Sequence, residues 1–334
     1  KIILYIFLLS ASFLFAEDYL VVIHSELYDY GIQSHLNYLL ENQQGHNLVY
    51  RQISNGIDSQ DIRNIIGNKN NHYNNLQYVL LIGQGRDNSI PSGKKFPAAN
   101  HTVNSNSGNY LPFFYYNDHI HWDERRDLPS DWKYVEGTDL LIGRVPAKNK
   151  TQIHLWLNKL ENYYQKVRQT NSYNEKIRFF CEDNKNTDNG CYGFFPRGGI
   201  NGVINEYLAG KSYYNPISHF MSDIHAPNNS QYSSSAEDFF ISKIEEGAAL
   251  TCVNGTGGSK SHMAGFVWDK HNSNSDWNFS GAEPTFIFGN TCSIGNTSNP
   301  NANTGTVLQD LLFDAQSGIA GFFGPTVYTN NSHV

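Results

Sequence analysis

The chain has 334 residues, a length typical of one large α/β unit or of two packed subdomains. Hydrophobic residues make up 39% of it, aromatic residues 14% and charged residues only 16%, which excludes a disordered or coiled-coil protein. The formal net charge is −7, with 24 Lys and Arg, 31 Asp and Glu and no basic run, so we expect no nucleic-acid partner.

The first sixteen residues have the composition of a secretory signal peptide. Lys1 precedes an apolar run from 2 to 15, which ends at Ala16 before Glu17. This run is shorter than the about 20 apolar residues that span a bilayer, and no later run is longer. We therefore expect cleavage after residue 16, a secreted or extracytoplasmic protein and no membrane span.

Seven short apolar runs have the length and composition of buried parallel strands. They lie at residues 19–23, 78–82, 139–143, 177–181, 248–253, 285–289 and 318–323. Segments with helical periodicity separate them, most clearly 151–167. Its apolar face consists of Ile153, Trp156, Leu157 and Leu160. This alternation predicts an α/β fold of layered parallel sheets with flanking helices.

A polar connector at 166–175 divides the predicted fold. We expect an N-terminal α/β subdomain over 17–167 and a C-terminal α/β subdomain over 168–334.

Residues that follow the predicted strands are the candidates for chemistry, because ligands bind outside the carboxyl ends of parallel strands. One strand is followed by Glu182 and Asp183, a second by the glycine-rich segment 254–259, and a third by a loop that contains Cys292. Glycines expose backbone N–H groups to an oxyanion, and an exposed thiol is a potential nucleophile. Plainer interpretations stay open: a solvated loop, a tight turn and a small buried hydrophobe.

The four cysteines and one acidic stretch are the candidates for a disulfide and for a metal site. Four cysteines are too few for a disulfide scaffold, and Cys181 and Cys191 either form one structural disulfide or stay reduced. An acidic, histidine-containing stretch is either a solvated loop or a site for Ca²⁺ or Zn²⁺. It consists of Asp118, His119, His121, Asp123 and Glu124. We expect no cofactor, and at most a structural Ca²⁺.

Several segments follow one another in a specific order. They are Tyr-Val-Leu-Leu-Ile-Gly at 78–83 with Ile90-Pro91, 139–147 ending in Ile-Gly-Arg-Val-Pro-Ala, the glycine-rich 254–258, Phe-Ile-Phe-Gly-Asn-Thr-Cys at 286–292, and 318–326. In this order they resemble the gingipain family of secreted cysteine peptidases, from about residue 18 to the end of the chain. The resemblance implies a caspase-like α/β fold of two subdomains and a protein or peptide substrate.

The resemblance also implies roles for individual residues. It makes Cys292 the nucleophile, Glu182 or its neighbour Asp183 the group that orients the base, and the N–H groups of Gly257 and Cys292 the oxyanion donors. The family places its histidine base between two glycines, where this chain has Thr256. A threonine hydroxyl does not take up a proton near neutral pH.

Two further residues bear on activity and specificity. His262, six residues after Thr256, is either a substitute base or a surface loop histidine. Arginine-specific relatives carry an acidic residue in the loop where this chain has Gly193, so a pocket here would favour an uncharged or aromatic side chain.

Two hypotheses follow: a gingipain-type cysteine endopeptidase domain, or a catalytically inactive member that serves as a secreted binding or scaffold module. Family members usually continue beyond the segment at 318–334.

Overall fold

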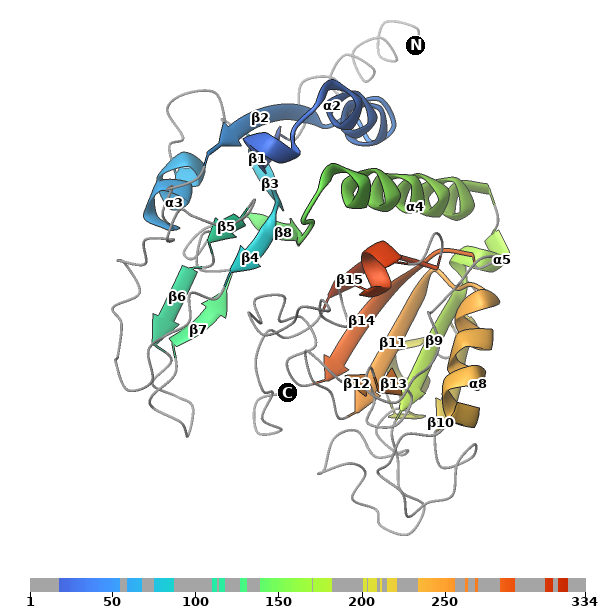
Figure 1. Cartoon of the computed structure of the whole chain (residues 1–334). Helices are drawn as coiled ribbons and strands as arrows, with labels where there is room; N and C mark the ends of the chain where they lie inside the picture. Colours follow the sequence, from blue (N-terminus) through green and yellow to red (C-terminus); the bar gives the residue numbers. More distant parts are fainter. Residues whose placement is uncertain are drawn as a thin grey trace, which may run out of the picture. The chain divides into compact units, whose positions relative to one another are not determined.

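The chain divides by compactness into two units, Lys1–His154 and Leu155–Val334, which are described separately. The division lies earlier in the chain than the predicted boundary between 167 and 168. The computed structural model (Figure 1) describes residues 18–54, 59–67, 75–86, 110–112, 114–117, 127–130, 139–169, 171–181, 201–202, 204–208, 211, 215–220, 234–255, 262–263, 268–269, 283–291, 310–314 and 318–323. The predicted signal peptide, 1–16, lies outside them.

The first unit is built on a parallel sheet with the strand order β2-β1-β3-β8. The strands of this unit are β1 (Asp18–His24), β2 (Asn47–Ile53), β3 (Leu76–Ile82), β4 (Gln84–Arg86), β5 (Tyr110–Pro112), β6 (Phe114–Asn117), β7 (Asp127–Ser130) and β8 (Leu141–Val145). The helical segments are η1 (Ser25–Leu27), α2 (Tyr30–Leu36), its π-helical continuation η2 (Asn37–Asn42) and α3 (Ser59–Gly67). β4 pairs with β5, and β6 pairs with β7.

The core of the first unit covers both faces of β1. Leu20 and Val22 pack in one hydrophobic cluster with Ile62 and Ile66 of α3. The intervening residues of β1 point to the other face and are equally buried. A strand that is buried on both faces needs a continuous apolar sequence, which explains why β1 was predictable as an apolar run.

The second unit holds a five-stranded parallel sheet with the order β10-β9-β11-β14-β15. The strands are β9 (Lys176–Cys181), β10 (Asn215–Phe220), β11 (Leu250–Gly255), β12 (His262–Met263), β13 (Trp268–Asp269), β14 (Thr285–Thr291) and β15 (Ile319–Phe323). The helical segments are α4 (Lys150–Gln169), which begins in the first unit, α5 (Asn171–Asn174), η6 (Ile204–Leu208), α8 (Ser234–Glu245) and η7 (Asp310–Asp314). The arrowheads of β9, β11 and β14 point the same way in Figure 1.

Helix α4 packs near the amino ends of the strands in the second unit. The indole N–H of Trp156 donates to the carbonyl of Ala320 at 3.1 Å, and the hydroxyl of Tyr163 donates to the carbonyl of Ala249 at 3.0 Å. Ala249 immediately precedes β11, and Ala320 is the second residue of β15. The carboxyl ends of these strands therefore lie at the edge away from these contacts.

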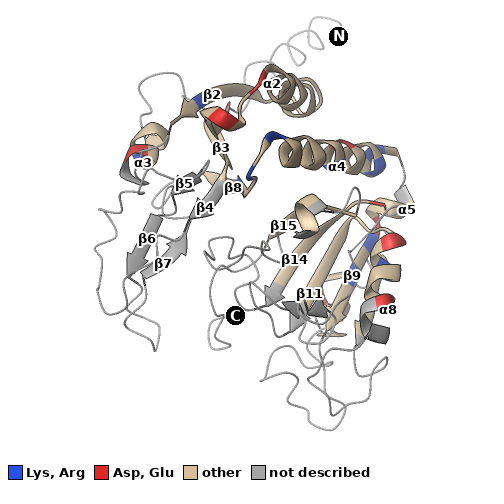
Figure 2. Ribbon diagram, in the orientation of Figure 1, with Lys and Arg blue, Asp and Glu red and all other residues tan. Residues whose placement is uncertain are grey.

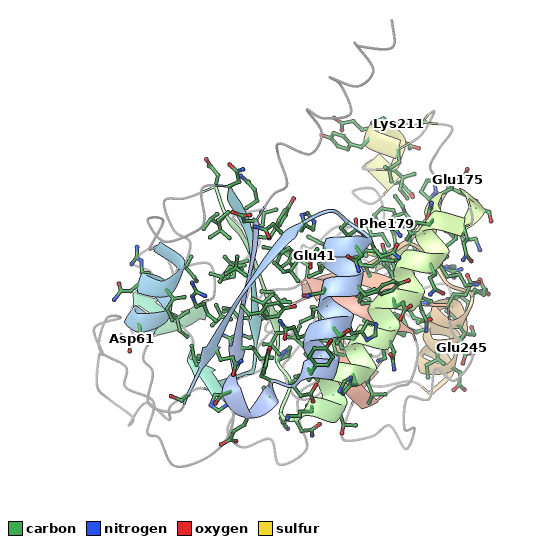
Figure 3. The ribbon with its side chains drawn as sticks, turned by 90° about the horizontal axis from the view of Figure 1, so that it is seen from above. Glu41, Asp61, Glu175, Phe179, Lys211 and Glu245 are labelled. Atoms are coloured by element: carbon green, nitrogen blue, oxygen red, sulfur yellow. The ribbon has the colours of Figure 1, made fainter. Side chains whose placement is uncertain are left out.

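The two faces of the sheet in the second unit have different cover. Phe179 of β9 (Figure 3) belongs to a cluster with Ile177 and Cys181, against which Ile204 of η6 packs. On the other face, the ring of Phe180 contacts that of Phe240 on α8 with a centroid distance of 4.7 Å. The exposed carboxylates of Asp61 on α3 and Glu245 on α8 lie at the outer sides of their helices (Figure 3).

The predicted fold class is confirmed, because each unit contains a parallel sheet with flanking helices, an arrangement consistent with a caspase-like fold. Each predicted strand overlaps an observed one, and the predicted helix 151–167 corresponds to α4. The run at 139–143 is displaced: β8 begins at Leu141, whose side chain is exposed on the edge strand. The predicted connector, 166–175, is largely helical, since it contains the end of α4 and all of α5.

Candidate functional site

Three neighbouring strands of the second unit end at the same level. β11 lies between β9 and β14, and Asn254 pairs in register with Cys181, the last residue of β9. Gly255, the last residue of β11, pairs with Thr291, the last residue of β14. Because parallel strands in this register finish side by side, the three following segments leave the sheet from one edge.

The predicted site residues are the next residues after these strand ends. Glu182 follows β9, Thr256 follows β11 and Cys292 follows β14 in the sequence. These three residues, together with Asp183, Gly193 and Gly257, lie outside the described residues. The structure therefore describes the strands that lead into the candidate site and not its side chains.

His262, the possible substitute base, is described for its backbone alone. It belongs to the two-residue strand β12 and pairs in antiparallel register with Asp269 of β13. A short hairpin thus follows the glycine-rich exit of β11, where the sequence alone had suggested a loop as one possibility.

The strands below the site are tied together by a buried hydroxyl pair. The hydroxyl oxygens of Thr251 on β11 and Thr285 on β14 lie 2.9 Å apart, and both residues are buried. A buried hydroxyl that loses its partner is costly, so this bond favours one register between the two strands. Sequence reasoning did not single out this pair.

The remaining described cysteines lie in the body of the sheet. Cys252 is a free cysteine in the middle of β11, and burial raises the pKa of its thiol to about 12. Cys181 is buried at the end of β9. Cys191, with which Cys181 would form the possible disulfide, lies outside the described residues, so both alternatives for the pair stay open.

Charge is absent from the strands that lead to the candidate nucleophile. β11, β14 and β15 contain no Lys, Arg, Asp or Glu, as Figure 2 shows for their described parts. The charged residues of β9 are Lys176 and Arg178. Arg178 is buried near the C-terminal end of α8, where its guanidinium donates to Glu246 at 3.0 Å and to the carbonyl of Gly247 at 3.3 Å.

Among the residues that the structure describes, no cluster of three or more His, Cys, Asp or Glu side chains could hold a metal ion. The acidic stretch from Asp118 to Glu124 lies outside these residues, so the possible Ca²⁺ or Zn²⁺ site is untested. Within the described part of the chain, no helix has the length and apolar character needed to cross a membrane.

The sequence profile of peptidase family C25 matches residues 16–334, nearly the whole chain. The chain therefore belongs to peptidase family C25, the gingipain family, and contains a cysteine peptidase domain. The resemblance noted in the sequence is thereby confirmed.

A solved structure described as "Structure of Protease" has a similar fold, with a TM-score of 0.58 and 12% sequence identity. The match covers 94% of this chain and 60% of that chain, so this chain spans about three fifths of the length of its structural neighbour. At this identity the likeness shows the fold alone. No curated protein sequence matches the chain.

Proposed function

We propose that this chain is the catalytic region of a cysteine endopeptidase that cleaves proteins through Cys292. One observation carries the proposal. Gly255 and Thr291 form a register pair at the ends of neighbouring strands, and they immediately precede Thr256 and Cys292. The family places its base and its nucleophile at these two positions, and a register pair supports their approach to one substrate bond.

In the proposed reaction, the thiolate sulfur of Cys292 attacks the carbonyl carbon of the scissile peptide bond. The C–N bond then breaks, the amine leaves with a proton, and water hydrolyses the resulting thioester to release the acid. The backbone N–H groups of Gly257 and Cys292 would stabilise the oxyanion. Glu182 or Asp183, which follow the other neighbour of β11, would orient a base that emerges from β11.

Thr256 limits this chemistry, because it stands at the position of the family base. A thiol with the ordinary pKa of about 8.5 is only about 3% thiolate at pH 7. Loss of a general base typically costs about 10²- to 10⁴-fold in rate. We therefore expect slow catalysis, unless His262 in the hairpin β12–β13 acts as the base.

A second function is favoured by the same substitution. Without an imidazole, the domain would retain the peptide-binding surface of the family while losing turnover, and it would act as a binding or scaffold module.

In both cases we propose that residues 1–16 direct the protein to an extracytoplasmic location. In both cases the absence of a carboxylate at Gly193 favours uncharged or aromatic side chains over basic ones.

The two functions are separated by the turnover of a mixed peptide library at neutral pH. Four forms of the chain are compared: wild type, Thr256→His, His262→Ala and, as the blank, Cys292→Ala. The peptidase proposal with a missing base predicts weak wild-type cleavage and a gain of about 10²-fold or more for Thr256→His. If His262 is the base, wild type cleaves well, His262→Ala abolishes cleavage and Thr256→His adds little.

The blank decides whether Cys292 is involved at all. Wild-type cleavage that persists in Cys292→Ala would overturn the peptidase proposal in either form. If no variant cleaves any peptide but the chain still binds peptides, the binding-module function is supported in its place.

A further inference from the structure

Two aromatic side chains are exposed side by side on the sheet of the second unit. Phe288 of β14 is 43% exposed and Phe323 of β15 is 65% exposed. The two residues form a register pair, and their rings are stacked with centroids 5.0 Å apart and planes 11° apart. We call this pair the Phe288–Phe323 platform.

The platform lies beyond the cover that α4 provides. The preceding pair on the same face is Phe286 with Gly321, where the ring of Phe286 fills the space above the glycine. Tyr163 of α4 contacts that ring at a centroid distance of 5.7 Å. The next pair toward the carboxyl ends of the strands is the platform, so apolar cover by α4 stops one pair before it.

The position of the platform connects it to the candidate site. Phe288 is three residues before Thr291, the last residue of β14, and Cys292 follows. Cys292 is thus four residues after Phe288, a separation of about 13 Å along the chain at 3.3 Å per residue. Because β11, β14 and β15 are uncharged, the described surroundings also favour an apolar ligand over a charged one.

We infer that the platform is a specificity subsite that binds an aromatic or large aliphatic side chain of the substrate. The inference rests on the proposed function and deepens it. An extended peptide covers about 13 Å in four residues, so the side chain that binds would be about four positions from the scissile bond. The residue next to the scissile bond is too close to Cys292 to reach the platform.

The size of the platform favours a single side chain over a second copy of the chain. A stable protein interface buries about 800 Å² on each partner. Fully burying one aromatic side chain removes only about 150–250 Å² from water, and both rings here are already partly covered. The platform is therefore too small to hold a dimer by itself, but it matches one apolar residue of a peptide.

The test measures peptide binding to the full chain carrying Cys292→Ala, so that it does not depend on turnover. The probes are fluorescein-labelled decapeptides of Gly, Ser and Asn with one central Phe, Leu, Lys or Asp, and the readout is fluorescence anisotropy. Phe323→Ser is introduced to remove the outer ring of the platform. The matched control is Tyr30→Ser, which removes an aromatic side chain that is 81% exposed in the first unit.

The inference predicts that the Phe and Leu peptides bind about 10- to 100-fold more tightly than the Lys and Asp peptides. Phe323→Ser should remove most of this preference, whereas Tyr30→Ser should leave it unchanged. Binding that shows no preference, or a preference that survives Phe323→Ser, overturns the inference. A wild-type dimer that dissociates on Phe323→Ser would also overturn it, because the platform would then be a contact between copies.

Failure of the proposed function has a different signature. An apolar preference that depends on Phe323, in a chain whose wild-type and Thr256→His forms cleave nothing, supports the subsite and rejects the peptidase activity. Cleavage with no dependence on Phe323 rejects the subsite and leaves the activity intact.

Discussion

The thiol of Cys252 is protected by its position inside β11, since burial raises its pKa to about 12. At pH 8 only about one such thiol in ten thousand is ionised, and the thiolate is the reactive form. Cys292 comes after the end of β14, at the same edge of the sheet as the end of β11. A cysteine beyond the sheet should react much faster than one within it.

We therefore predict that brief iodoacetamide treatment at pH 8 alkylates Cys292 before Cys252. Peptide mapping by mass spectrometry gives the order of labelling. If Cys181 is reduced, it serves as a buried internal control and should also label slowly until the chain is unfolded by urea. Labelling of Cys252 ahead of Cys292 would contradict the proposed site.

At the scale of the elements, Lys159 ties helix α4 to η7. Its side chain is buried, and its ammonium group donates to the carbonyls of Leu311 and Leu312 at 3.2 and 2.8 Å. Lys166, two turns later on the same helix, bonds instead to the carboxylate of Glu283, and both of these side chains are partly exposed. Buried polar groups that lose a partner cost far more than exposed ion pairs do.

This contrast yields a stability prediction. Lys159→Met should lower the free energy of unfolding by about 2–4 kcal/mol, because two carbonyls lose a charged donor. Lys166→Met, the matched control, should lower it by less than about 1 kcal/mol. Urea denaturation of both variants measures the difference. Equal losses in the two variants would show that the buried hydrogen bonds of Lys159 stabilise the fold no more than the exposed ion pair of Lys166 does.

His219 makes the packing of α8 sensitive to acid. Its ring lies between those of Phe180 and Phe239, with centroid distances of 5.0 and 5.2 Å. Burial, with smaller contributions from the cations Arg178 and Lys243, lowers the pKa of His219 to about 4, although Glu246 opposes the shift. In the unfolded chain the pKa returns to about 6.5, so the unfolded state binds more protons between these two values.

The sign of the effect follows from this difference. As the pH falls from about 6.5 toward about 4, His219 makes the folded state progressively less stable, and above about 6.5 it has no effect. We predict that His219→Phe reduces the loss of stability between pH 7 and pH 4.5. Urea midpoints of wild type and variant at the two pH values provide the test, and an unchanged loss would contradict the prediction.

The central strands were predicted from their continuous apolar runs and α4 from its helical stripe, and the edge strands β8 and β15 were predicted from short apolar runs as well. The missed strands β2 and β10 lie at the edges of their sheets, where polar residues interrupt the apolar run. The predicted run began too early because Leu140, which precedes β8, is an apolar residue that packs against the core cluster of the first unit without belonging to the strand. Periodicity detects burial, and edge strands are only partly buried.

At the scale of the whole molecule, the two units repeat one strand order. In each sheet the first strand of the unit lies between the second and the third, as in β2-β1-β3-β8 and β10-β9-β11-β14-β15. In such an order the connections run in opposite directions on the two sides of the first strand, which creates a topological switch point. Ligands bind at the carboxyl ends of the strands beside this switch point. In the second unit the switch point lies between β9 and β11, next to the predicted Glu182 and Thr256.

The strands that lead to the candidate site were predictable, whereas the site residues themselves and their activity stay predictions. The rule that ligands bind outside the carboxyl ends of parallel strands could be applied from the order of the apolar runs alone. The register of β9, β11 and β14, whose carboxyl ends lie side by side, agrees with this rule. Whether a base reaches Cys292 depends on the loops after these strands, whose paths leave no periodic signal in a sequence. The proposal that Thr256 takes the place of the family histidine rests on the resemblance to the family.

The central proposal is that Thr256, which follows β11, takes the position of the family base, so that Cys292, which follows β14, lacks an imidazole partner. The most direct test is the rate of iodoacetamide alkylation of Cys292 as a function of pH, in wild type and in Thr256→His. The proposal predicts that the wild-type rate follows an ordinary thiol with a pKa of about 8.5. In Thr256→His, an imidazolium beside the sulfur should shift the profile by at least about one pH unit to lower pH and make the thiol reactive below pH 7. Superimposable profiles for the two proteins would contradict the proposal.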